Sequence, residues 1–140
     1  MRTLFFIAAL VAACAAVSAP DRAQFVFVRI PEALQPSERG AKYEDPLDAA
    51  LKQAAVGEVT GGGSQLSAPD KEGKRSVEWI GIDVDLTDFD KGLPVLRREL
   101  LRLGAPGSTV LEYTRNGEKI EETLEKAYPG DAANREQACD

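Results

Sequence analysis

The chain has 140 residues, a net charge of −6 at neutral pH and no histidine. The lack of histidine excludes Ser-His and Cys-His nucleophilic pairs and the imidazole ligands of most zinc and copper sites. An acidic surface repels phosphate backbones, so we do not expect nucleic acid as a partner. No motif in the sequence predicts a metal or a cofactor.

Residues 1–19 have the order of a secretory signal peptide: Arg2, an apolar stretch from Leu4 to Ala13, and then small residues. A transmembrane anchor is the alternative, but the uncharged run from Thr3 to Ala19 has only 17 residues and many are alanine, whereas a span needs about 20 strongly apolar residues. We therefore predict a periplasmic or secreted bacterial protein. Loss of Arg2 takes the 17 basic residues to 16 against 23 acidic ones, which gives a net charge of −7.

The two cysteines lie near the two ends of the chain. Cys14 follows residues 11–13 in the pattern of a lipoprotein signal, which would anchor the mature chain to a bacterial membrane through a lipid on Cys14; ordinary cleavage near Ser18 or Ala19 is the alternative. Cys139 has no internal disulfide partner once the signal is removed. It is expected to be a free thiol or to form an intermolecular disulfide.

The first strand is predicted at Gln24–Pro31, where aromatic and β-branched residues end at a proline. Its alternation places Val26, Val28 and Ile30 on one face and Phe25, Phe27 and Arg29 on the other. The polar segment Glu32–Glu44 is interpreted as a connecting loop. Asp45-Pro46 then supplies an N-cap and a first helical proline, which predicts a helix over Pro46–Val56 that ends at Gly57.

A weak strand with three successive glycines is predicted around Glu58–Leu66, followed by a charged hairpin loop over Ala68–Ser76. The segment Val77–Leu86 has the strongest strand pattern in the chain. Its apolar residues Ile80, Ile82, Val84 and Leu86 alternate with Gly81, Asp83, Asp85 and Thr87. Asp83 and Asp85 are therefore expected to be neighbours on the face away from the core.

A second amphipathic helix follows, with Asp88 or Thr87 as its N-cap and Gly104 at its end. Its apolar stripe consists of Phe89, Leu93, Leu96, Leu100 and Leu103. Asn116-Gly117 between two alternating runs predicts a hairpin, which would pair Arg115 with Glu118 and Tyr113 with Ile120. Residues 125–140 are polar and are expected to form a disordered tail.

The order of these elements predicts a single α+β domain over residues 20–124. It resembles the ferredoxin-like βαββαβ sandwich, with one antiparallel sheet, two helices on one face and an extra C-terminal β-hairpin strand. The resemblance concerns architecture alone, because no motif of a functional family is present. This architecture serves ligand sensors, propeptides, RNA binders and enzymes, so it does not define a function.

The aspartates between residues 83 and 90 do not match a calcium-binding loop, because the places that require glycine and glutamate hold Asp88 and Pro94. We interpret Asp83 and Asp85 as the solvated side of a strand and predict no catalytic residue. The alternative is a small hydrolase in which Asp83 and Asp85 act as a pair of catalytic carboxylates, but no desolvating neighbour is evident in the sequence.

The glycine-rich stretch is a candidate ligand site. Gly61, Gly62, Gly63 and Ser64 expose backbone amides and a small hydroxyl at a sheet edge, although the lysine and helix start of a phosphate-binding loop do not follow. The favoured interpretation is a bulged strand that another backbone or side chain approaches closely.

Phe25, Phe27 and Trp79 are the candidate partner interface, since their alternation places them on the sheet face opposite the core. The loop Glu32–Glu44, the N-terminal segment or the C-terminal hairpin could instead cover these side chains. The sequence favours a non-catalytic exported domain that binds a partner protein, a second copy of itself or a small ligand.

Overall fold

The computed structural model describes residues 22–127 of the chain. The predicted signal segment with Cys14, the end of the polar tail and Cys139 lie outside the described residues. In the part that the structure describes, no helix is long and apolar enough to cross a membrane.

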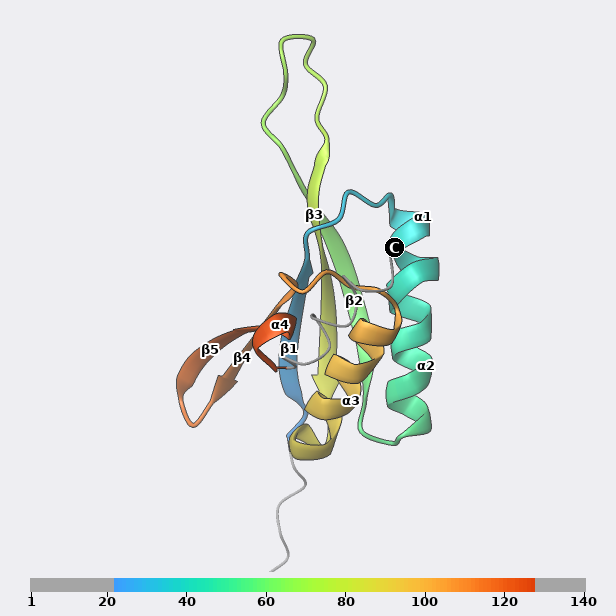
Figure 1. Cartoon of the computed structure of the whole chain (residues 1–140), viewed down its shortest axis with the longest axis vertical. Coiled ribbons are helices and arrows are strands. Elements are labelled where there is room, and N and C mark those ends of the chain that lie inside the picture. Colours follow the sequence, from blue (N-terminus) through green and yellow to red (C-terminus); the bar gives the residue numbers. More distant parts are fainter. Residues whose placement is uncertain (1–21, 128–140) are drawn as a thin grey trace, which may run out of the picture.

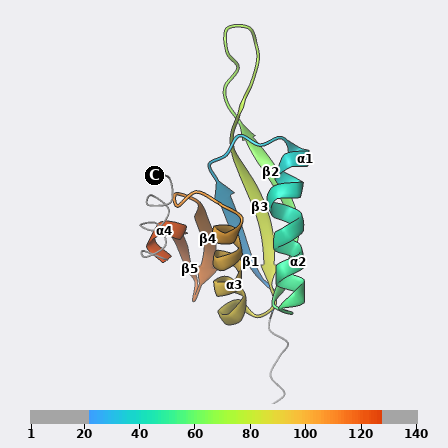
Figure 2. The ribbon, with the colours of Figure 1, turned by 45° about the vertical axis from the view of Figure 1, so that its right-hand side comes forward.

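The described residues form an α+β arrangement with one antiparallel sheet, whose strand order is β2-β3-β1-β4-β5. The strands are β1 (Gln24–Ile30), β2 (Gly57–Leu66), β3 (Val77–Leu86), β4 (Val110–Arg115) and β5 (Glu118–Thr123). The helical elements are α1 (Pro36–Arg39), the π-helical turn η1 (Gly40–Glu44), α2 (Asp45–Gln53), α3 (Phe89–Arg102) and α4 (Leu124–Ala127). Helices α2 and α3 lie on the same side of the sheet (Figures 1 and 2).

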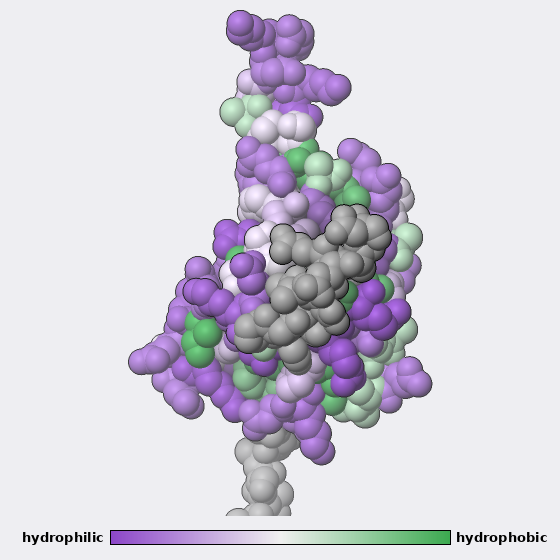
Figure 3. Space-filling model, in the orientation of Figure 1, coloured by the Kyte–Doolittle hydropathy of each residue, from purple (hydrophilic) through white to green (hydrophobic). Residues whose placement is uncertain are grey.

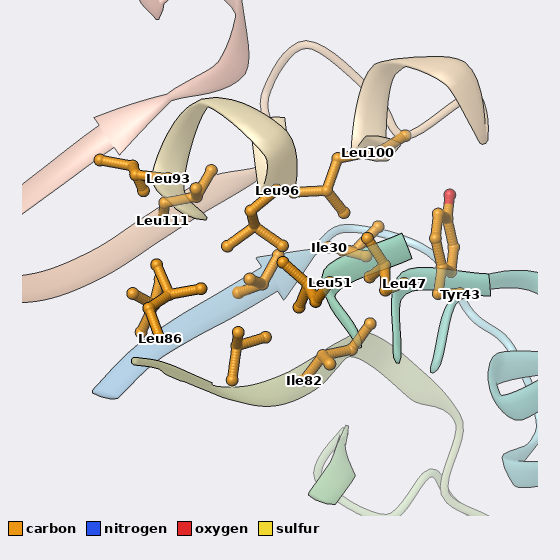
Figure 4. Packing of buried hydrophobic residues seen from close by; sticks show 14 of the residues in the cluster. Ile30, Tyr43, Leu47, Leu51, Ile82, Leu86, Leu93, Leu96, Leu100 and Leu111 are labelled. Carbon is orange, nitrogen blue, oxygen red and sulfur yellow. The ribbon is translucent and has the colours of Figure 1, made fainter. Parts of the chain in front are cut away.

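The core lies between this face of the sheet and the two helices, and its side chains point toward one another (Figure 4). The predicted alternation of β1 and β3 is confirmed, because Val26 pairs with Val84 and Val28 pairs with Ile82, and all four are fully buried. The helices contribute Leu47, Leu51, Leu93, Leu96 and Leu100. The side chains at the alternate positions of each strand therefore form the second face of the sheet, away from these helices.

The interpretation of Glu32–Glu44 as a loop holds only as far as residue 35 and is wrong beyond it, because a continuous helical segment begins at Pro36 and runs through η1 into α2. Asp45 is not an N-cap, since its backbone has the helical angles φ −63° and ψ −49° and its N–H donates to the Gly40 carbonyl five residues back. Pro46 has no N–H for the Lys42 carbonyl, and its ring crowds that carbonyl. The wider π turn before Pro46 relieves this conflict without ending the helix.

Tyr43 ties this helical segment to the core. Its side chain is fully buried, and its hydroxyl donates to Glu32 Oε1 at 2.6 Å. Lys42 Nζ lies 2.7 Å from Glu32 Oε2. The Glu32 carboxylate therefore pairs with both the Tyr43 hydroxyl and the Lys42 ammonium group. Because the neighbouring residues are polar, the sequence did not indicate that Tyr43 is one of the largest fully buried side chains.

The predicted second helix and C-terminal hairpin are confirmed. The Asp88 carboxylate accepts the N–H of Lys91 at 3.1 Å at the start of α3, and Gly104 has a φ of +83° just beyond its end. Asn116 and Gly117 have positive φ angles of 51° and 80°, as a two-residue hairpin turn requires. The register pairs Arg115 with Glu118 and Tyr113 with Ile120, as expected.

The prediction that the disordered tail includes residues 125–127 is wrong. Residues 124–127 form the helical turn α4, and Leu124 is fully buried. The N–H of Leu124 donates to the Thr109 carbonyl at 3.1 Å, and that of Glu125 donates to the Gly107 carbonyl at 3.1 Å. The end of β5 is thus fixed to the loop before β4.

The connection between β2 and β3 projects from the body as a long hairpin arm (Figure 1), and Figure 3 shows that its surface is largely hydrophilic. Residues 68–76 are all exposed. Asp70 organises the tip, since its Oδ1 accepts the N–H groups of Glu72 at 3.0 Å and Lys74 at 2.7 Å. This is the hairpin loop that the sequence predicted.

Candidate functional site

The candidate site lies on the sheet face opposite α2 and α3, which we call the open face. The three residues of the predicted interface all lie there: Phe25 is 51% exposed, and Phe27 and Trp79 are half-buried. Strands β1 and β3 are direct neighbours, and this pairing brings the rings of Phe27 and Trp79 into contact. Strand β5 extends the sheet at its edge, and Arg39 of α1 reaches the helix side of β2. Neither of these elements therefore covers the open face.

An aromatic pair forms the centre of the open face. The rings of Phe27 and Trp79 meet edge to face, with centroids 6.1 Å apart and an interplanar angle of 78°. A Cβ on Gly81 would lie 2.6 Å from the Phe27 ring, so glycine at this position lets the ring lie across β3. The Arg29 guanidinium lies 5.9 Å from the centre of the Trp79 ring on a neighbouring strand.

The glycine-rich strand β2 has two different surroundings on its two faces. On the helix side, a Cβ on Gly62 would collide with the ion-paired side chains of Glu44 and Arg39, and Arg39 also donates to Ser64 Oγ at 3.0 Å. The ladder shifts register between Val59 and Gly61. The favoured interpretation, a bulged strand that a side chain approaches closely, is therefore confirmed.

On the open face, Gly63 leaves space unfilled, whereas Gly61 lies against Asp83. A Cβ on Gly63 would meet no atom within 4 Å, and a Cβ on Gly61 would lie 3.4 Å from Asp83 Oδ2. A hollow of about 240 Å³ results, lined by Phe27, Gly62, Gly63, Ser64, Gln65, Trp79, Gly81 and Asp83. We call this the glycine hollow. It joins Gly62, Gly63 and Ser64 of the predicted ligand stretch to Phe27 and Trp79 of the predicted interface, whereas Gly61 and Phe25 do not line it.

A second, larger hollow of about 760 Å³ lies on the β4 side of Phe27. It is lined by Arg22, Ala23, Gln24, Phe25, Phe27, Glu112, Tyr113, Thr114 and Lys119. Sequence reasoning missed the contribution of β4 and β5, although the hairpin register that places Thr114 opposite Lys119 was predictable.

The carboxylates of the open face differ in their partners. Glu58 lies 3.9 Å from Lys52, Glu112 lies 3.3 Å from Arg29, and Glu121 lies 3.5 Å from Lys119. Asp83 and Asp85 are half-buried, and among the described residues their carboxylates form no ion pair or side-chain hydrogen bond. The described residues contain no group of three or more acidic, histidine or cysteine side chains that could hold a metal ion.

No protein-family model matches the sequence, and no curated protein matches it. Among solved structures, the chain is similar to a phage SAM lyase in complex with S-methyl-5′-thioadenosine, at 11% sequence identity and a TM-score of 0.42. The alignment covers 81% of this chain and 98% of that chain. A likeness this weak carries no argument about the site or its chemistry.

Proposed function

We propose that the chain is a small exported bacterial domain, non-catalytic, that binds a partner protein through its open sheet face. The observation that carries the proposal is the cluster of Phe25, Phe27 and Trp79 on a face that α2 and α3 leave uncovered. Aromatic side chains gathered on an exposed surface commonly mark an interface, because covering them removes a large apolar area from water.

The proposed architecture is the ferredoxin-like βαββαβ sandwich. The strand order supports it, because β1 lies between β3 and β4 while β2 lies outside β3. In this description, β5 is the extra hairpin strand on the outer edge of β4. Such a sheet has one face covered by helices and one face free for binding, as the proposal requires.

A small ligand is the second candidate occupant. The hollow of about 760 Å³ beside Phe25 and Phe27 favours it, since small-molecule pockets usually measure about 300–1,000 Å³. The hydrolase alternative with Asp83 and Asp85 stays a prediction. It requires that turnover of a substrate be lost in the double variant Asp83→Asn/Asp85→Asn while the chain stays folded.

A photocrosslinking experiment tests the proposal. Benzoylphenylalanine in place of Phe25, in the full chain produced in its bacterial host, is expected to form one discrete protein adduct. The matched control carries the same probe at Gln53, an exposed position at the end of α2 and away from the open face. Mass spectrometry identifies the adduct and, through the mature N-terminus, shows whether Cys14 is retained with a lipid.

The proposal also predicts that Phe27→Ser reduces the adduct, because this change removes apolar contact area from the same face. Equal adducts from positions 25 and 53, or none from position 25, would contradict a protein partner on the open face. If a small compound that copurifies with the chain prevents the crosslink at position 25, the small-ligand alternative is favoured.

A further inference from the structure

We propose that the glycine hollow receives a lysine or arginine side chain of the partner protein. This inference rests on the proposed function, since it names the group of the partner that reaches the open face. The volume of about 240 Å³ favours one inserted side chain, because it is below the roughly 300–1,000 Å³ of pockets that enclose whole small molecules.

The shape of the glycine hollow suits a long, unbranched side chain. Its base is the backbone of β2, where Gly63 carries no Cβ and a Cβ would meet no atom within 4 Å. Its wall is the edge-to-face pair of Phe27 and Trp79 on the two adjacent strands. The methylene groups of a lysine or arginine can lie along such a wall while the charged end reaches a carboxylate.

The charges of the glycine hollow select a cation. Asp83 is the one ionisable residue among those that line it, and its carboxylate has no partner in the described part of the chain. The nearby cations are already engaged: Arg29 pairs with Glu112 and Arg39 with Glu44. A bound cation would therefore gain the attraction of a free carboxylate together with that of the aromatic rings.

The rest of the open face agrees with this selection. Its other carboxylates have basic neighbours in Lys52, Arg29 and Lys119, so unpaired negative charge is concentrated at Asp83 and Asp85. Asp85 lines a separate hollow that Lys52 also lines. A basic partner surface would complement this face, whereas an acidic one would be repelled.

Nuclear magnetic resonance tests the inference with a defined probe, N-acetyl-lysine methylamide. The probe is added to the ¹⁵N-labelled mature protein, with the N-terminus that the protein has in its host. We expect saturable shifts of the backbone amides of Gly61–Ser64 and of the Trp79 indole N–H. The uncharged probe N-acetyl-norleucine methylamide, which has a similar length, is expected to produce no saturable shift at the same concentrations.

Two variants and one control locate the binding. Asp83→Asn removes the charge and keeps the shape. Gly63→Val fills the open space, since a Cβ at this position meets no atom within 4 Å. Each change should weaken binding of the lysine probe by about fivefold or more. Asp85→Asn makes the same change two residues along the same strand face and should alter the affinity by less than about twofold. Thermal unfolding confirms that all three variants are folded.

Equal shifts from the two probes, or equal weakening by Asp83→Asn and Asp85→Asn, would overturn the inference, since the attraction would then be unspecific. The two proposals fail separately. If the adduct from position 25 forms but no saturable shift occurs, the glycine hollow is not a cation site and the open face remains an interface. If no adduct forms at position 25, the proposed function itself is wrong.

Discussion

At the scale of single residues, the sheet depends on where glycine is required and where it is merely present. A Cβ on Gly57 would collide with the Asp85 carbonyl and lie 3.0 Å from Leu86 Cα, both of which are fixed backbone atoms. A Cβ on Gly63 would meet nothing within 4 Å. The two glycines belong to the same strand, so they form a matched pair.

We predict that Gly57→Ala lowers the free energy of unfolding by about 1–3 kcal/mol, because the backbone of β3 must move to admit the methyl group. Gly63→Ala should leave it unchanged or raise it by up to about 1 kcal/mol, since alanine reduces the freedom of the unfolded chain. Urea unfolding of both variants measures the difference. Similar losses in the two variants would contradict the described packing of β2 on β3.

Tyr113 links the core to a polar group at the edge of the sheet. Its hydroxyl donates to Glu122 Oε2 at 3.3 Å, and Arg97 donates to the other oxygen of the same carboxylate. Burial raises the pKa of the Tyr113 phenol, and the charge of Glu122 raises the pKa further. The folded protein therefore holds this proton more tightly than the unfolded chain does.

This difference predicts a loss of stability at alkaline pH. The contribution of Tyr113 is fully present below the unfolded pKa of about 10 and is lost as pH rises through the higher folded pKa, because the unfolded chain releases its proton first. Tyr113→Phe should make the decline of the unfolding free energy between about pH 9 and 11 shallower. Parallel declines in the two proteins would show that Tyr113 does not contribute.

At the scale of elements, strong patterns made some parts of the fold predictable. Strict alternation over Val77–Leu86 predicted both ends of β3, and Asn116-Gly117 predicted the register of the last hairpin. The segment Glu32–Glu44 was misread because polar residues surround Tyr43 and because Asp45-Pro46 imitates a helix start. A π turn directly before Pro46 compensates for the proline, and the usual helix-start pattern does not indicate such a turn.

The helical state of this segment can be tested at Ala41, an exposed residue of η1. Ala41→Gly should lower the free energy of unfolding by about 1 kcal/mol, the usual cost of glycine within a helix. The control is Ala33→Gly, because Ala33 is also exposed but lies before the helix; its effect should stay within about 0.5 kcal/mol. Equal effects in urea unfolding would restore the loop interpretation.

The candidate site was predictable only in pieces. Period-two alternation placed Phe25, Phe27, Trp79 and the aspartates on one face, and the structure agrees. That Gly62, Gly63 and Ser64 border the same aromatic pair could not be derived, since it depends on the register of β2 against β3 and on the irregularity after Val59. The positions of unpaired charge likewise depend on which lysines and arginines come near.

At the scale of the whole molecule, the two faces of the sheet differ in what covers them. One face supplies stability, because its apolar residues are buried under α2 and α3. The other face retains exposed or half-buried aromatic rings, hollows on both sides of Phe27 and the carboxylates of Asp83 and Asp85, which have no partner among the described residues. We therefore propose that one face stabilises the fold and that the other binds the partner.

Trp79 is the only tryptophan in the sequence, so its fluorescence reports directly on the open face. The most direct test is a titration of the mature chain with the purified partner identified by crosslinking, while the Trp79 emission is recorded. The account predicts a blue shift that saturates at one partner per chain, as the indole is removed from water. Binding detected by calorimetry with no change in the Trp79 emission would contradict the account, because the partner would then lie elsewhere.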